Sequence, residues 1–209
     1  MMLMTTKIKE LLAFMDERYP HVGCELQYNK DYELVIAVML SAQTTDTSVN
    51  KVTEVLFNKY DSLEKLSKAK LEDVEDIIHS IGLYKNKAKN VLGITQTLLS
   101  DYGCILPSDK EELQKLPGVG NKTAGVIRAE IFHIPDLPVD THILRISKRL
   151  KLVEKDADAY NTEMKLKSLV KEEKWIQLHH QLIHFGRDMC TARNPQCENC
   201  KISGFCTKK

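Results

Sequence analysis

Apolar residues recur every three or four positions along most of this chain, which is the period of a helix packed on a core. The stretch ELVIAVMLSAQ (33–43) is apolar almost throughout, as in a buried strand or a buried helix. Because no partner strand is evident elsewhere, we predict that it is a helix. The other helical stripes cover residues 8–15, 49–56, 71–78, 88–99, 108–116, 121–132, 140–150, 157–172 and 174–186.

Capping residues locate several helix ends. Thr6 is a candidate N-cap for the first helix, and Gly82 a candidate C-cap for the helix over 71–78. Ser108 and Glu111 have the spacing of a capping box, and Asp140 is placed to cap the helix that follows it. Two prolines interrupt the helical pattern at 134–139, which predicts a hinge. The fold class that these patterns predict is all-α.

Composition narrows the functional classes only slightly. The chain has 209 residues, of which 43% are hydrophobic and 6% aromatic, and its formal net charge is +1. This total neither supports nor excludes a nucleic-acid partner, so only local features can decide. The first twenty residues lack the pattern of a secretory signal, and no window approaches the ~18 apolar residues of a membrane span. We therefore expect a cytoplasmic protein with no membrane partner.

The stretch LPGVGNKTA (116–124) predicts two helices joined by a glycine hairpin. Pro117 ends one helix, and Gly118 and Gly120 permit a tight turn with positive φ before the next helix begins. Exposed amides at a helix N-terminus suit a phosphate oxygen without any net positive charge. The alternative is a plain turn between helices that binds nothing.

Lys122 lies in the first helical turn, where the helix dipole disfavours a cation. A solvated surface lysine would explain its presence but not this position. The functional alternative is that its amine acts as a nucleophile. Such a lysine needs a carboxylate partner, and Asp140 is the best candidate because the chain can return beside Lys122 over residues 133–140. The alternative is that Asp140 only caps the helix that follows it and takes no part in a reaction.

Four of the six cysteines lie within the last twenty residues, at Cys190, Cys197, Cys200 and Cys206. A disulfide framework would be spread through the fold, so this crowding indicates a metal site. Four thiolates can bind either zinc or an iron–sulfur cluster.

Taken together, LPGVGNKTA, the VDTH that follows its lysine, and the Cys-x6-Cys-x2-Cys-x5-Cys tail resemble the endonuclease III family of helix-hairpin-helix DNA glycosylases. LSAQTTD (40–46) and SIGLYKNKA (80–88) match family segments in the same order. The resemblance implies two helical domains with a DNA cleft between them: residues 22–134, which contain the hairpin, and residues 1–21 plus 135–209. It also favours a four-iron four-sulfur cluster over zinc at the cysteines.

The resemblance further implies what individual residues do. Lys122 is the expected nucleophile toward the sugar C1′ of a damaged nucleotide, and Asp140 the group that assists it. The remaining matches concern DNA: the amides of Gly118, Val119 and Gly120 hold phosphate, Gln43 fills the gap left by the flipped nucleotide, and Ile81 and Leu83 wedge apart the opposite strand. Basic residues that could contact phosphate are Arg187, Arg193 and Lys201, then Lys85 and Lys89, then Arg145, Lys148 and Arg149.

The activity expected from this resemblance is removal of oxidised pyrimidines from double-stranded DNA and cleavage of the abasic site by β-elimination. We expect a monomer that acts on damaged bases or abasic sites, nucleoid-associated if the source is prokaryotic. Asn121 and Gln114 depart from common family residues, so the resemblance predicts the reaction class but not the lesion preference. The alternatives are a monofunctional glycosylase, against which Lys122 argues, and a non-catalytic DNA-binding module with a structural metal.

Overall fold

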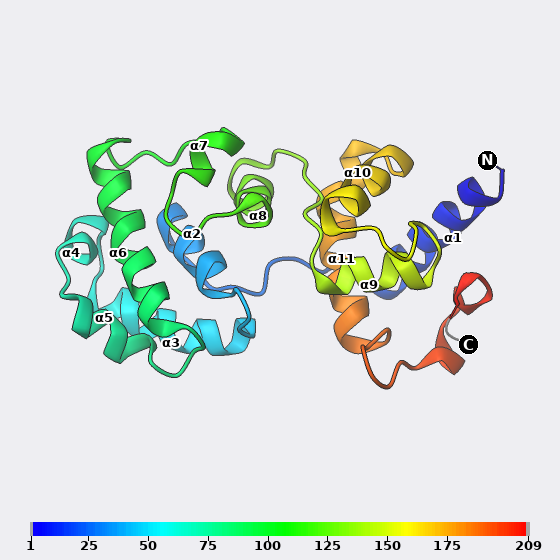
Figure 1. Ribbon diagram of the computed structural model, residues 1–209, viewed down its shortest axis with the longest axis horizontal. Coiled ribbons are helices and arrows are strands. Elements are labelled where there is room, and N and C mark those ends of the chain that lie inside the picture. The colour runs from blue at the N-terminus through cyan, green and yellow to red at the C-terminus, as the bar shows by residue number, and fades with distance from the viewer. Residues whose placement is uncertain (1, 208–209) are drawn as a thin grey trace. The chain divides into compact units, whose positions relative to one another are not determined.

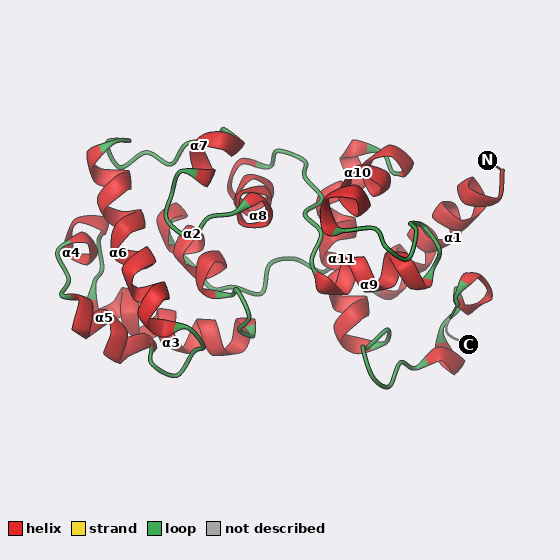
Figure 2. Cartoon of the chain, viewed as in Figure 1, coloured by secondary structure: helices red, strands yellow, loops and turns green. Residues whose placement is uncertain are grey.

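The computed structural model describes residues 2–207, with side chains described from residue 4. Over these residues the chain is helical with no strand, which confirms the all-α prediction (Figures 1 and 2). None of the described helices is both long and apolar enough to cross a membrane. The α-helices are α1 Met2–Arg18, α2 Asp31–Leu40, α3 Asp46–Lys59, α4 Leu63–Ser67, α5 Leu71–Ile78, α6 Tyr84–Ser100, α7 Lys110–Gln114, α8 Asn121–Phe132, α9 Thr141–Arg149, α10 Ala159–Leu169 and α11 Trp175–Asp188. Short 3-10 turns are η1 Glu172–Lys174, η2 Cys197–Asn199 and η3 Ser203–Phe205.

The chain divides into two compact units. One is Glu25–Ile134, and the other joins Met1–Cys24 to Pro135–Lys209 and is called the terminal unit below. The chain passes from the terminal unit into the Glu25–Ile134 unit after Cys24, and returns at the proline-rich segment over 134–139.

The Glu25–Ile134 unit is built around α2. The side chains of Leu34, Ile36 and Leu40 have no exposed surface, and nearly every other residue of the helix is also buried. A helix that is apolar on all sides must be covered on all sides. Helices α3, α6 and α8 pack against α2 and provide that cover. Residues 33–40 of the run over 33–43 are therefore a buried helix, as predicted, whereas residues 41–43 form a turn beyond its end in which Ala42 and Gln43 are exposed.

In the terminal unit, α1 and α9 both pack on α11. The rings of Phe14 and Phe185 meet edge to face in its core, with their centroids 5.7 Å apart. A buried polar cluster lies beside this core, where the ammonium of Lys167 donates to the carboxylates of Asp136 and Glu163. Because Asp136 follows Pro135, this cluster ties the start of the segment that leads to Asp140 onto α10.

Three predicted helix ends are wrong. Thr6 lies inside α1, which already begins at Met2, so it is not the N-cap. Helix α5 ends at Ile78 with His79 as its C-cap, and Gly82 lies beyond the end. Asp109, not Ser108, caps α7, because its carboxylate accepts from the amides of two following residues at 2.9 and 3.0 Å. The pattern also missed α4, which is only five residues long.

Candidate functional site

The hairpin between α7 and α8 is shaped by one left-handed glycine, not two. Gly118 has φ +77°, and a Cβ atom there would lie 2.4 Å from Nδ2 of Asn90 and 3.0 Å from Cγ of Met39. Gly120 has φ −93°, with nothing within 4 Å of a Cβ atom. The expectation that both glycines supply positive φ is therefore wrong for Gly120. Any need for glycine there must come from a partner that approaches its backbone.

The amides at the start of α8 fit the predicted phosphate-binding site only in part. Gly120 is the N-cap and has no side chain to accept from the first turn, so the amides of that turn are not capped from within. The amide of Val119 donates to the carbonyl of Leu116 at 3.0 Å, and its side chain is buried. The predicted role of the Val119 amide in holding DNA is thus not supported, because this donor is already engaged. Its side chain instead anchors the turn in the core.

Lys122 is the second residue of α8, as predicted, and its side chain is exposed. Within the Glu25–Ile134 unit, no hydrogen bond or ion pair holds its ammonium group. Within this unit, Lys122 therefore has no surface ion pair that would account for its position in the first turn of α8. It is presented to solvent directly beside the uncapped amides.

Asp140 is the N-cap of α9, as predicted. Its Oδ1 accepts a hydrogen bond from the amide of Ile143 at 2.8 Å, which fixes the direction of the carboxylate. This bond uses one oxygen and leaves Oδ2 for another partner. The side chain is half-buried. The residue is thus a cap, and its geometry also offers an acceptor held in a constant orientation.

Gln43 and Leu83 are both exposed, and both have left-handed backbone, with φ of 55° and 60°. Leu83 has 61% of its surface exposed. Ile81, by contrast, is 3% exposed and belongs to the core, so its burial does not support the prediction that it wedges DNA. Of the two apolar residues in that turn, only Leu83 presents its side chain to solvent.

One residue beside these two was missed. Lys87, between the candidates Lys85 and Lys89, is buried, and its ammonium donates to the Ala42 carbonyl and to Thr44 Oγ1, each at 2.8 Å. Burial lowers the pKa of Lys87. The available signal was its register, because Lys87 precedes Val91 by four residues on the apolar stripe of α6.

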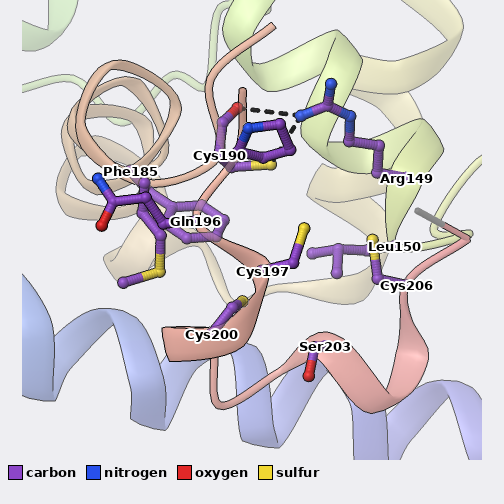
Figure 3. Close-up of a pocket in the computed structure, with 11 residues that line it drawn as sticks. Arg149, Leu150, Phe185, Cys190, Gln196, Cys197, Cys200, Ser203 and Cys206 are labelled. Carbon is purple, nitrogen blue, oxygen red and sulfur yellow. Dashed lines mark hydrogen bonds between the residues drawn. The ribbon is translucent and has the colours of Figure 1, made fainter. Parts of the chain in front are cut away.

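The four cysteines of the C-terminal tail line one pocket (Figure 3). None of them forms a disulfide. Among the described residues, no three metal-binding side chains converge closely enough to hold a single ion. Four cysteines that line one pocket supply the four thiolates that a four-iron four-sulfur cluster takes as ligands. The residues present therefore fit the expected four-iron four-sulfur group.

Two arginines of α9 hold the loop that begins at Cys190. Arg149 donates to Thr191 O at 2.7 Å, to Ala192 O at 3.0 Å, and to both the carbonyl and the sulfur of Cys190 at 3.2 Å. Arg145 donates to the Cys190 carbonyl at 3.1–3.2 Å and to Gly186 O at 2.9 Å. Their guanidinium groups are thus committed to the loop backbone, and the prediction that they contact phosphate is not supported.

The other basic candidates of this tail differ in availability. Lys201 forms an ion pair with Glu17 of α1. Arg193 is exposed on the loop between the first two cysteines. Of these two residues, Arg193 is the one whose position suits a phosphate.

Comparison with known proteins places this chain among DNA repair proteins. Residues 36–172 match the HhH-GPD superfamily of base excision DNA repair proteins, and residues 190–206 match the iron–sulfur binding domain of endonuclease III. Endonuclease III of Bacillus subtilis (strain 168) is 43% identical over 205 residues, which cover 98% of this chain and 94% of that protein. The Escherichia coli (strain K12) protein is 38% identical over 200 residues, covering 96% and 94%.

Among solved structures, a trapped covalent intermediate between endonuclease III and DNA superposes with a TM-score of 0.94 at 42% identity, covering 97% of this chain and 95% of that one. A non-covalent complex of endonuclease III with DNA matches equally well. Both the sequence relatives and these structures extend over nearly the whole chain, and the cysteine tail is included in the match. The chain belongs to the endonuclease III family of the HhH-GPD superfamily of base excision DNA repair proteins.

Proposed function

We propose that Lys122 and Asp140 carry the reaction of this base excision repair enzyme, a DNA glycosylase with lyase activity that removes oxidised pyrimidines from duplex DNA. The observation that carries the proposal is Lys122 itself: an exposed amine in the first turn of α8, without a partner in its unit, next to uncapped amides. A relative that is 42% identical has been trapped covalently on DNA, which requires a nucleophile of this kind.

The reaction follows from an amine and a carboxylate. The neutral amine of Lys122 attacks C1′ of the damaged nucleotide, and the bond from C1′ to the base breaks with its electron pair leaving on the base. Loss of a proton from the nitrogen and opening of the sugar give an iminium at C1′. The iminium acidifies the C2′ proton, and its removal expels the 3′ phosphate and cuts the strand. Asp140 offsets the positive charge that develops on the sugar and moves protons between these steps.

DNA binding is assigned to exposed backbone and side chains. A base inside a duplex is out of reach, so the damaged nucleotide must be extruded at a cost of a few kcal/mol. The first-turn amides of α8 and the backbone of Gly118 and Gly120 hold phosphate, which suits a chain whose net charge is only +1. Gln43 fills the space that the base leaves, and Leu83 enters the stack as an apolar wedge. Arg193 adds a phosphate contact.

The four-iron four-sulfur cluster belongs to the C-terminal tail, and we assign its ligands to Cys190, Cys197, Cys200 and Cys206. The cluster supplies a rigid cross-link to a tail that has only short 3-10 turns of its own. The resulting loop carries Arg193 at a constant position. We place the protein in the cytoplasm, with the nucleoid if the source is prokaryotic.

Borohydride trapping tests the central assignment, because it reduces the imine to a stable protein–DNA adduct. Wild-type protein should form the adduct on a duplex with one oxidised pyrimidine, and Lys122→Gln should lose both adduct and nicking while it still binds DNA. Lys115→Gln is the matched control, since Lys115 is an exposed lysine on the other side of the same hairpin. Asp140→Asn keeps an N-cap oxygen and should fold, but base release should slow by about 10²–10⁴-fold.

The outcomes also separate the alternatives. Full adduct yield from Lys122→Gln would assign the nucleophile to another amine. Base release by wild-type protein with neither nick nor adduct would indicate a monofunctional glycosylase. Binding with no base release at all would indicate a non-catalytic DNA-binding module.

A further inference from the structure

The side-chain ammonium of Lys87 is hydrogen-bonded to the loop that carries Gln43. Lys87 reaches from α6 and donates to the carbonyl of Ala42 and the hydroxyl of Thr44, each at 2.8 Å. These are the residues immediately before and after Gln43, whose φ of 55° turns its exposed side chain away from the regular backbone path. The ammonium therefore bonds to the residues on either side of Gln43, whose backbone is left-handed.

The same lysine is bonded to the turn that carries Leu83. Its main-chain amide donates to the Leu83 carbonyl at 3.0 Å, which closes the first turn of α6. Leu83 is the N-cap of that helix, with φ of 60° and no side-chain cap of its own. Lys87 is thus connected through its backbone to one exposed left-handed residue and through its side chain to the loop of the other.

Packing alone does not account for a lysine at this position. Only 4% of its surface is exposed, and burial lowers its pKa, so the charged form is held at a cost. No carboxylate forms an ion pair with it among the described residues; its side-chain partners there are a carbonyl and a hydroxyl. An apolar residue would fill the same stripe of α6 without that desolvation cost.

We propose that Lys87 is a positioning residue, which holds the Gln43 loop and the Leu83 turn as one preformed unit for opening the DNA stack. This inference rests on the proposed function, in which these two side chains enter the duplex. Neither loop then has to be ordered when DNA binds, so the binding energy is available for extruding the nucleotide. Lys87 itself touches neither DNA nor the reacting atoms.

A comparison of two substrates tests this role. A duplex with a single abasic site requires extrusion of the sugar from a stack, whereas the same abasic site in single-stranded DNA does not. Lys87→Met removes the donor but keeps a long side chain in the buried stripe. Borohydride trapping by Lys87→Met should slow by about 10- to 100-fold on the duplex, the scale of a displacement of about 1 Å, and should change less than about 2-fold on the single strand.

The controls isolate the effect. Lys68→Met makes the same substitution at an exposed lysine of the same unit and should leave both rates unchanged. Thermal unfolding establishes that each variant is folded at the assay temperature. If Lys87→Met does not fold, Thr44→Val decides the question, because it removes one of the two acceptors and leaves the lysine in place. It should show the same selective loss on the duplex, at smaller size.

Equal loss on both substrates, or wild-type rates on both, would overturn the positioning role. Failure of the proposed function would be distinguishable, because wild-type protein would then trap neither substrate. A fluorescent base analogue opposite the abasic site gives a second measurement. Its emission should rise on binding wild-type protein, as the stack opens, and rise less with Lys87→Met at saturating protein.

Discussion

Gly118 and Gly120 are separated by a single residue along the chain, and replacing each by alanine should separate folding from DNA binding. At Gly118 the backbone has φ +77°, where an L-residue costs about 1–2 kcal/mol. The added Cβ would also lie 2.4 Å from Nδ2 of Asn90 and 3.0 Å from Cγ of Met39, and such overpacking costs about 1–3 kcal/mol. Gly118→Ala should therefore lower the free energy of unfolding by about 2–5 kcal/mol.

Gly120→Ala is the matched control for this prediction. Its φ of −93° is allowed for alanine and a Cβ there would meet open space, so stability should change by no more than about 0.5 kcal/mol. Urea unfolding followed by circular dichroism measures both values. Gly120→Ala should nevertheless bind duplex DNA more weakly, with an unchanged salt dependence because no charge is removed. A loss below about 1 kcal/mol for Gly118→Ala, or DNA binding at the wild-type level for Gly120→Ala, would refute the reasoning at that residue.

Two further predictions concern the terminal unit. Arg149→Met removes the donors to Cys190, Thr191 and Ala192, so the visible absorption of the cluster should bleach faster than in wild-type protein when an iron chelator is added; equal rates would contradict the assignment. Burial and a hydrogen bond to Asp188 raise the pKa of Tyr19 from 10.0 to about 12. The folded state then keeps a proton that the unfolded state loses over this range, so the free energy of unfolding falls as pH rises through it. Tyr19→Phe should fall less steeply over the same range in urea titrations, and an unchanged slope would show that Tyr19 is not responsible.

Much of the helical architecture was predictable because its causes are local. Helix α8 begins at Asn121 and ends at Phe132, as the proline, the glycines and the apolar stripe indicate, and Asp140 caps α9. The errors arise where two local signals compete. Ser108 and Asp109 are both good caps, and Asp109 forms the bonds because its carboxylate reaches two amides at once. Which of two neighbouring caps is used depends on how the chain enters the turn, and composition does not specify that.

The candidate site residues could be proposed from the sequence as a group, but the exposure of each side chain could not. Ile81 and Leu83 are both apolar and lie in one turn, so a pattern treats them alike. The structure buries Ile81 and exposes Leu83, because the left-handed backbone at Leu83 turns its side chain away from the core. Gly118 and Gly120 diverge in the same way, since only Gly118 has positive φ. One backbone angle thus separates two residues that the pattern treats alike.

The roles of the positively charged side chains could not be predicted from the sequence alone. In a pattern, a lysine or arginine beside a DNA-binding motif indicates a phosphate contact, because opposite charges attract. Three of them in this chain bond to neutral backbone carbonyls instead: Lys87 to the Gln43 loop, and Arg145 and Arg149 to the cysteine loop. Long side chains with several donors can order a loop that has no secondary structure of its own. In these three residues the hydrogen bonds to a loop, and not an attraction to phosphate, account for where the charged group lies.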